Sequence, residues 1–330
     1  MQAKKMIKQI GAALGVSFLC SAFSLANASD YPAKPVKIIV PFAPGGATDI
    51  IGRLLADKLS QSLGQPFIVE NRAGAGGAIG TDAIAKAAPD GYTLGISTVS
   101  SLAVNPACNP KLSYDPTKDF SYVTNVAGVP NVVTVNPSKI PAKDFNEMLK
   151  MIKGAPGKYT YATSGACGIG HMMGELFEES TKTALVHIPY RGAGPALTDV
   201  LGGQVDMMFD NMPSSVPHIQ GGKLKLMAVA APKRVALFPD VPTFTELGHP
   251  SVNEQASYGL IGPANLPADV MKKLFDGITK MLAQPDVKTK LDSLGATGIG
   301  NSSADFRKQM EGELTKMKHI VKTKNIKFTD

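Results

Sequence analysis

Short apolar runs alternate along this chain with longer segments whose apolar residues recur at helical spacing. The run Val36–Val40 predicts a buried strand, and Ile51, Leu55 and Leu59 fall on one face of a helix over residues 50–59. The order of strand, loop and helix then recurs, which predicts parallel sheets built from βαβ units. We expect further strands over residues 67–70, 92–97, 122–127, 131–135, 158–163, 186–190, 206–210, 225–230 and 258–262. We expect further helices over residues 81–88, 144–153, 171–180, 195–201, 269–282, 286–294 and 303–322.

The loops that follow these strands are rich in glycine, proline and small polar residues. The first, over residues 40–49, has the sequence Val-Pro-Phe-Ala-Pro-Gly-Gly-Ala-Thr-Asp. Its glycines let a ligand approach the backbone, and Thr48 or Asp49 can cap the next helix, whose free N–H groups favour an anion. Ligands of open α/β sheets bind at the carboxyl ends of strands, so this loop is a candidate site. An ordinary strand-to-helix turn explains the stretch equally well.

The first residues have the pattern of a secretory signal peptide. Three lysines within the first eight residues precede an apolar stretch over residues 10–25, and Ala-Asn-Ala follows at 26–28. A basic region, a short apolar region and an Ala-x-Ala site predict export and cleavage after about Ala28. Serines interrupt the apolar stretch, which makes a membrane anchor the weaker alternative. We therefore expect residues 1–28 to be removed and the mature protein, from about Ser29, to be soluble and exported.

Composition, charge and the absence of certain motifs exclude several classes of function. The 330 residues are 44% hydrophobic, enough for one large or two medium domains with cores of their own. Removing the three lysines of the leader lowers the formal net charge from +7 to +4, and no basic run with interleaved aromatic residues occurs, so we expect no nucleic-acid partner. The sequence has no G-x-x-x-x-G-K-[ST] phosphate loop and no G-x-S-x-G nucleophile elbow, and its five histidines are scattered. We therefore expect no metal and no cofactor.

Two cysteines remain after the leader, Cys108 and Cys167. In an oxidising compartment they could form a disulfide, and two separate buried thiols fit the sequence about as well. Cys167 also stands in a glycine-rich loop before a predicted helix, and His171 follows four residues later, which suits a thiolate and its partner base. An exported cysteine enzyme is therefore an alternative function, although an oxidising compartment disfavours a free catalytic thiol.

A series of ordered motifs resembles a known family. The motifs are Tyr31-Pro-x-Lys-Pro, Val40-Pro-Phe-Ala-Pro-Gly-Gly-Ala-Thr-Asp49, Val69-Glu-Asn-Arg-x-Gly-Ala-Gly-Gly77, Pro89-Asp-Gly-Tyr-Thr-Leu94, Tyr114-Asp-Pro-x-Lys-Asp-Phe120, Gly168-x-x-His171, His187-Ile-Pro-Tyr-Arg-Gly192, Pro195-Ala-Leu-Thr-Asp199, Gly202-Gly-Gln-Val-Asp206, Phe209-Asp-Asn211 and Pro239-x-Val-Pro-Thr243. With them, from about Tyr31 to Ile326, the chain resembles the periplasmic solute receptors of tripartite tricarboxylate transporters, also called Bug receptors. It departs from the family pattern at Ser257, where an aromatic residue often stands, and at Cys167 and the loop over residues 105–110.

The resemblance implies two doubly wound α/β domains of the type II periplasmic binding protein class, joined by a hinge and enclosing a ligand cleft. It implies that residues 29–126 and 252–330 form domain 1 and residues 127–251 form domain 2. It further implies a receptor that is not an enzyme and acts as a monomer. Such a receptor captures a small carboxylate (a dicarboxylate, an amino acid or an aromatic acid) by domain closure and delivers it to inner-membrane transporter subunits. A periplasmic sensor that docks onto a signalling partner is an alternative.

If the family fold holds, the loops at the strand ends meet at this cleft. The residues that we then expect to bind the ligand are Phe42, Gly45, Gly46, Ala47, Asp49, Gly76, Gly77, Ser97, Ser100, Thr163, Ser164, Gly168, His171, Arg191, Asp210 and Asn211. Several have an ordinary structural alternative. Phe42 could belong to the core, Asp49 and Asp210 could cap helices, His171 could cap its own loop, and Arg191 could form a surface ion pair.

Overall fold

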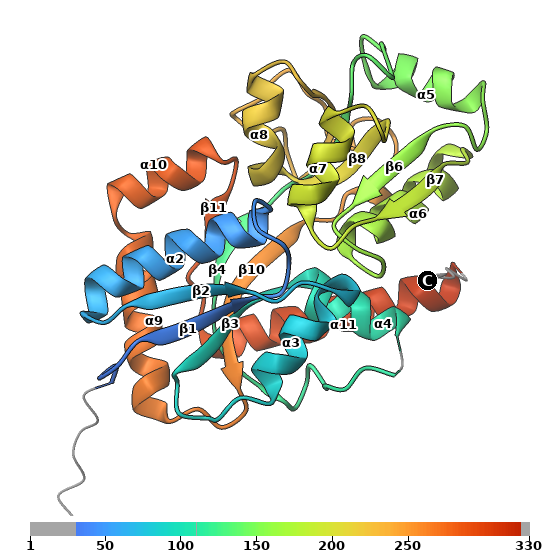
Figure 1. Cartoon of the computed structure of the whole chain (residues 1–330). Helices are drawn as coiled ribbons and strands as arrows, with labels where there is room; N and C mark the ends of the chain where they lie inside the picture. The colour runs from blue at the N-terminus through green and yellow to red at the C-terminus, as the bar shows by residue number, and fades with distance from the viewer. Residues whose placement is uncertain (1–30, 110, 325–330) are drawn as a thin grey trace, which may run out of the picture.

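The computed structural model describes residues 31–109 and 111–324. The leader predicted over residues 1–28 and its cleavage site lie outside these residues. Within the described ranges, no helix combines the length and the apolar character that crossing a membrane requires. The chain forms two lobes, each built on its own sheet (Figure 1).

The first lobe is built on a six-stranded sheet with the order β11-β4-β10-β3-β1-β2. Its apolar runs form the parallel strands β1 (Val36–Val40), β2 (Phe67–Asn71) and β3 (Thr93–Thr98), and β10 (Ala256–Pro263) pairs antiparallel with both β3 and β4 (Phe120–Val129). The short β11 (Thr297–Gly298) closes the edge beside β4. The helices of this lobe are α2 (Ala47–Leu63), α3 (Ala78–Ala85), α4 (Asn105–Cys108), α9 (Ala268–Leu282), α10 (Pro285–Ser293) and α11 (Ser303–Thr323), with a 3₁₀ turn, η1, over Ala75–Gly77.

The second lobe is built on a five-stranded sheet with the order β7-β6-β8-β5-β9. Its strands are β5 (Asn131–Val135), β6 (Thr160–Thr163), β7 (Val186–Pro189), β8 (Met207–Asn211) and β9 (Lys225–Ala230), of which β7, β6 and β8 are parallel. Its helices are α5 (Phe145–Lys153), α6 (Ile169–Thr181), α7 (Ala193–Leu201) and α8 (Met212–Gln220). The Asp144 side chain caps α5, because its carboxylate accepts the Glu147 N–H at 2.9 Å.

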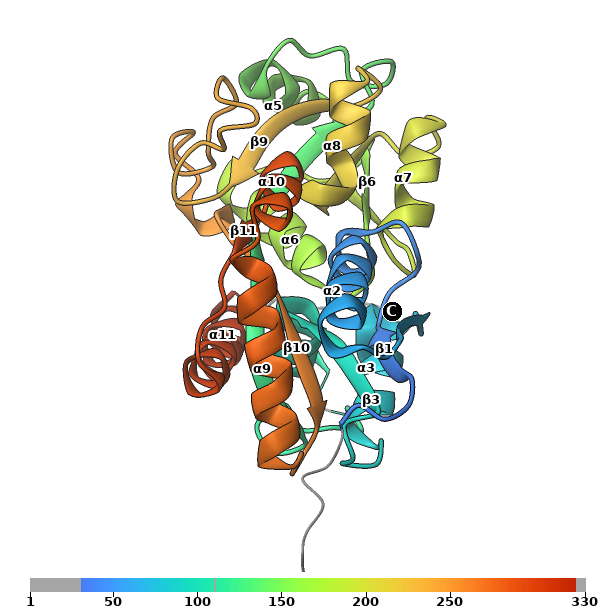
Figure 2. The ribbon, with the colours of Figure 1, turned by 90° about the vertical axis from the view of Figure 1, so that its left-hand side faces the viewer.

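The chain crosses between the lobes twice. Strand β4 ends at Val129 in the first sheet and β5 begins at Asn131 in the second, so Pro130 is the first crossing. The return passes through the irregular stretch after β9, the 3₁₀ turn η3 (Pro250–Val252) and the start of β10. Figure 2 shows the two lobes one above the other, with the crossing strands on one side. These two crossings are the backbone connections between the lobes.

Two large apolar cores hold the fold. One lies within the first lobe between the sheet and α2 and α9, with Ile38, Leu55 and Leu274 fully buried. The other continues from the first lobe into the second, since it includes Phe306 of α11, Val133 of β5 and Phe177 of α6. The lobes therefore share buried apolar contacts in this conformation.

The structure differs from the predicted elements at several places, and α4 and β11 were not predicted. Helix α2 begins at Ala47, before the predicted residue 50, because Gly46 is its N-cap and Asp49 lies in its first turn. The segment after β3, predicted to be a polar loop, forms a π-helical turn, η2 (Ser100–Val104), whose residues are all buried. Helix α8 was not predicted because it contains two prolines; the first of them stands where a helix tolerates proline.

Candidate functional site

A narrow cavity lies between the two lobes. Its free volume is about 10 Å³, which is room for about one water molecule. The lobes are therefore closed on each other. The residues that line it are Phe42, Gly46, Ala47, Thr48, Thr98, Val99, Ser100, Ala256 and Tyr258 from the first lobe and Ser164, Ile169, Ala193 and Asn211 from the second.

Four helices begin at this cavity. Helix α2 contributes Ala47 and Thr48 from its first turn, α6 contributes Ile169, α7 contributes Ala193, and Asn211 is the N-cap of α8. In none of these four described helices does the N-cap side chain accept a helix N–H. The first N–H groups of a helix have no intrahelical acceptor, and they carry partial positive charge. The cavity is therefore suited to an anion even though no arginine lines it.

Hydroxyl groups supply the polar side chains of the cavity. Ser100 accepts the Ile169 N–H at 2.9 Å, which joins η2 of the first lobe to the start of α6 in the second. Burial, reinforced by the charge of Asp210, raises the pKa of the Tyr258 phenol, so its hydroxyl stays neutral and able to donate. Such groups can bind a carboxylate oxygen or a bridging water.

The structure brings a part of the sequence-predicted set to the cavity. Phe42, Gly46, Ala47, Ser100, Ser164 and Asn211 all line it. Sequence reasoning missed Thr48, Thr98, Val99, Ile169, Ala193, Ala256 and Tyr258. Most of these are neighbours of predicted residues on the same loops, so taking each loop as a whole would have found them. Tyr258 and Ala256 come from β10, which reaches the site only because it pairs with β3.

Four predicted glycines do not line the cavity, and two of them lie where the lobes approach each other. A Cβ on Gly76 would collide with the Ala166 carbonyl oxygen of the second lobe, and its φ of +61° is unfavourable for any other residue. A Cβ built on Gly45 would lie 3.6 Å from the Gly194 Cα of the second lobe. Gly77 packs on the ring of Phe42, and Gly168 is the N-cap of α6. Gly45 and Gly76 therefore allow the close approach of the two lobes.

Other predicted residues have structural partners. Ser97 donates to the Gly259 carbonyl at 3.2 Å, and Thr163 pairs with the His187 ring at 2.7 Å. Asp49 accepts the Gly45 N–H at 3.1 Å and binds Arg53, which makes it part of the loop framework. The side chain of Arg191 is exposed, and its backbone carbonyl accepts the Ala43 N–H at 3.1 Å. None of these four side chains lines the cavity.

His171 is buried behind the loop over residues 164–168. Its Nδ1 accepts the Cys167 N–H at 3.3 Å, and its ring stacks on His187 with centroids 3.8 Å apart. Burial, with His171 nearby, lowers the pKa of His187 to about 3, so this ring is neutral at pH 7. The pair supports the loop from behind and does not line the cavity.

Asp210 is buried directly before Asn211. One carboxylate oxygen accepts the hydroxyls of Ser214 and Ser215 at 2.7 and 2.6 Å, and the other has no hydrogen-bond partner in the described part of the chain. Burial raises the pKa of Asp210 to about 6, although the serine hydrogen bonds oppose the shift. The carboxyl group therefore stays protonated to a higher pH in the folded protein than in the unfolded chain, where its pKa is about 4.

This shift predicts how stability depends on pH. The stability that Asp210 contributes is complete below about pH 4 and is lost as pH rises through about 6. Asp210→Asn stays neutral throughout, so we expect its free energy of unfolding to rise relative to the unsubstituted protein between pH 4 and pH 7. Urea unfolding at several pH values measures this difference, and a difference that stays constant across the window would contradict the assignment.

Cys108 and Cys167 form a disulfide, with Cα atoms 6.2 Å apart. Cys108 ends α4 of the first lobe, and Cys167 lies in the loop before α6 of the second. The thiol of Cys167 is therefore not available as a nucleophile. Among the described residues there is also no group of three or more His, Cys, Asp or Glu that could hold a metal ion.

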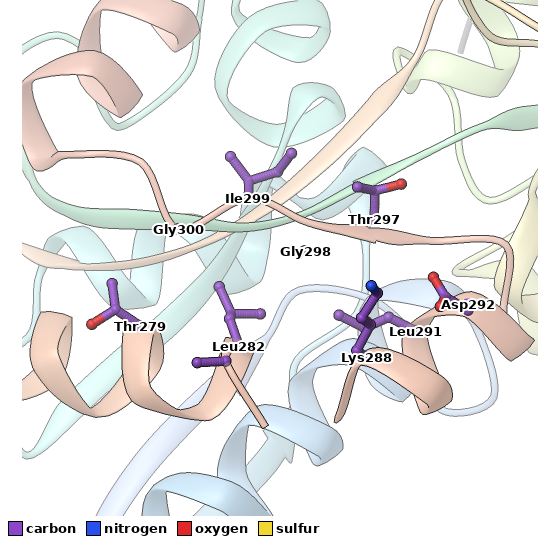
Figure 3. Close-up of a pocket in the computed structure, with 10 residues that line it drawn as sticks. Thr279, Leu282, Lys288, Leu291, Asp292, Thr297, Gly298, Ile299 and Gly300 are labelled. Atoms are coloured by element: carbon purple, nitrogen blue, oxygen red, sulfur yellow. The ribbon is translucent and has the colours of Figure 1, made fainter. Parts of the chain in front are cut away.

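A wider hollow of about 390 Å³ lies elsewhere on the first lobe, between α9, α10 and β11. In Figure 3 the side chains of Leu282 and Leu291 point towards the segment Thr297–Gly300. No residue of the second lobe lines this hollow and no helix begins at it. The interlobe cavity, with four helix starts, is the better candidate.

Two α/β lobes that close on a cavity between them define the class of periplasmic solute-binding receptors. The family model of the tripartite tricarboxylate transporter family receptor matches residues 51–326, so the chain belongs to this family. Protein BugT of Bordetella pertussis is 35% identical over 329 residues, which cover 99% of this chain and all of BugT. The sequence-based family assignment is confirmed, and the relatives are receptors, not enzymes.

Solved structures agree with this fold. One described as a periplasmic transporter is 52% identical and superposes with a TM-score of 0.89, covering 91% of this chain and all of the other. Rpa4515 of R. palustris with adipate is 31% identical, with a TM-score of 0.87 and coverage of 90% and 99%. MatC of Rhodopseudomonas palustris with bound malate is 32% identical, with a TM-score of 0.84 and coverage of 88% and 100%. The predicted fold class is confirmed.

Proposed function

We propose that this protein is a periplasmic receptor that binds a small dicarboxylate between its lobes and delivers it to a tripartite membrane transporter. The observation that carries the proposal is the convergence of four helix N-termini, two lobes and several hydroxyl groups on one buried cavity. Backbone N–H groups at helix starts bind carboxylates without a buried counter-charge. The adipate and malate in two related structures support the same ligand class.

Binding requires the lobes to part. A cavity of about 10 Å³ cannot hold a dicarboxylate, so the ligand enters a more open form. The hinge at Pro130 and before Ala256 permits rigid-body rotation of one lobe against the other. In this proposal, residues 29–126 and 252–330 act as domain 1 and residues 127–251 act as domain 2. Closure brings Ser100 of the first domain and Ile169 of the second onto the same ligand.

A thermal-shift screen of ligand-stripped protein tests the proposal. The panel contains adipate, malate, other di- and tricarboxylates, acidic amino acids and aromatic acids. A ligand at about 100 times its dissociation constant stabilises the folded state by roughly 2.7 kcal/mol. For a chain of this size that corresponds to about 5–10 °C in melting temperature. Dimethyl adipate, which has the same carbon chain without the charges, is the matched control and should give no shift. The absence of a shift with every acid would refute carboxylate binding.

A further inference from the structure

In addition to their shared apolar contacts, the two closed lobes have four connections outside the ligand cavity. The first is the hinge, where the chain crosses at Pro130 and again before Ala256. The second is the disulfide between Cys108 and Cys167. The third is a backbone hydrogen bond from the Ala43 N–H to the Arg191 carbonyl, at 3.1 Å. The fourth is the ion pair between Lys324 at the end of α11 and Glu179 of α6, at 2.7 Å. The first two connections are covalent, and the other two can separate without breaking a covalent bond.

The disulfide side of the cleft is closely packed around the covalent link. Gly76 of η1 meets the Ala166 carbonyl, and the Asn105 amide donates to the Ala75 carbonyl at 2.7 Å, so η1 and α4 form one unit facing the second lobe. The buried Leu102 of η2 and Met173 of α6 belong to the same apolar cluster across the lobe boundary. The Cα atoms of a disulfide remain within about 7 Å of each other, so this side cannot open far.

The loops over residues 42–46 and 190–194 meet through backbone groups and the small side chains of Ala43 and Ala193. A Cβ on Gly192 would lie 2.7 Å from the Ala43 nitrogen, and one on Gly194 would collide with the Pro44 carbonyl oxygen. Pro44 and Arg191 are exposed. Among the described residues, no disulfide and no ion pair joins these two loops. These contacts form when the lobes close and can be lost when they open.

We propose that the Cys108–Cys167 disulfide fixes one side of the interlobe cleft, so that the receptor opens asymmetrically. The lobes then rotate about an axis that passes near the hinge and the disulfide. The ligand enters and leaves between the loops over residues 42–46 and 190–194. This inference rests on the proposed closure around a ligand, but it concerns how the cleft opens and can be tested with no ligand present. Reduction of the disulfide leaves the hinge as the remaining covalent connection, so the side of the cleft at Cys108 and Cys167 can also open.

Two backbone amides report separately on the two sides of the cleft. The Ala43 N–H is bound only to Arg191, across the lobe boundary. The Ile169 N–H, two residues after Cys167, is the first of α6 and is bound to the Ser100 hydroxyl of the other lobe. A first-turn amide has no intrahelical acceptor, so its protection against hydrogen exchange depends on the other lobe. The hydrogen-exchange rate of each amide therefore measures the opening of its own side of the cleft.

Residue-resolved hydrogen exchange of the oxidised, ligand-free protein is the test. We expect a protection factor at least tenfold lower for Ala43 than for Ile169. In the double variant Cys108→Ser/Cys167→Ser, and in the unsubstituted protein treated with a phosphine reductant, the protection of Ile169 should fall at least tenfold towards that of Ala43. The reductant should have no effect on the double variant, which is the matched control.

Three results would overturn the proposal. One is unchanged protection of Ile169 after the disulfide is removed, which would assign that side to the apolar cluster alone. Another is equal protection of Ala43 and Ile169 in the oxidised protein, which would mean symmetric opening. The third is a fall at Ile169 no larger than the fall at the buried amides of β1, since those amides report global unfolding. All three are independent of whether the protein binds a carboxylate.

Discussion

Gly194→Ala is expected to weaken dicarboxylate binding by about 10- to 100-fold while leaving the fold intact. Gly194 lies in the first turn of α7, where alanine suits the helix. Its added methyl group would collide with the Pro44 carbonyl oxygen of the other lobe. Overpacking of this kind costs about 1–3 kcal/mol, and here the cost falls on the closed state alone. Because the proposed closure around a ligand brings these two loops together, the same free energy appears as lost affinity, at about 1.4 kcal/mol for each factor of ten.

Isothermal titration with adipate or malate, whichever stabilises the protein more in the screen, measures this loss. Gly312→Ala is the matched control, because Gly312 lies in α11 and a Cβ there meets nothing within 4 Å. The control should bind as the unsubstituted protein does. The ligand-free melting temperature of Gly194→Ala should be no lower than that of the unsubstituted protein. Unchanged affinity would show that the ligand does not need the closed approach of Pro44 and Gly194.

The double variant Cys108→Ser/Cys167→Ser is expected to lose about 4 kcal/mol of stability. The disulfide closes a loop with a sequence separation of 59 residues. In the chain-entropy model, a cross-link over a loop of this length restricts the unfolded chain by roughly that free energy. For a protein of this size the melting temperature should fall by roughly 8–16 °C. Differential scanning calorimetry without ligand measures the change.

The reduced and alkylated unsubstituted protein should melt close to the double variant, since both lack the cross-link. A fall of less than about 3 °C would show that the native state loses little when the link is removed. That outcome would point to residual contact between the segments around Cys108 and Cys167 in the unfolded chain. It would leave the exchange experiment at Ala43 and Ile169 unaffected, because that experiment concerns opening within the folded protein.

Much of the fold could be read from local patterns. The apolar run at Val36–Val40 and the helical spacing of Ile51, Leu55 and Leu59 gave β1 and α2 because burial on one face follows directly from such periodicity. Helix α8 and the turn η2 were missed for a physical reason. Two prolines argue locally against α8, and its serine contacts to Asp210 come from the folded environment. The turn η2 contains small polar and apolar residues without a clear period, and burial beside α11 and α6 determines its shape.

The sequence by itself determined the class of protein: its ordered motifs, its α/β alternation and the glycine-rich loops at strand ends are all local properties of the chain. Only the tertiary structure decided which loop residues line the cavity. Ser97 and Ser100 are three residues apart and both buried, yet one bonds to β10 and the other faces the cavity. The pairing of Cys108 with Cys167 was decided in the same way, because whether two thiols meet depends on the closure of two lobes. The spacing of apolar residues along the chain indicates which side chains are buried. The packing of separate helices and strands determines which groups each buried side chain contacts.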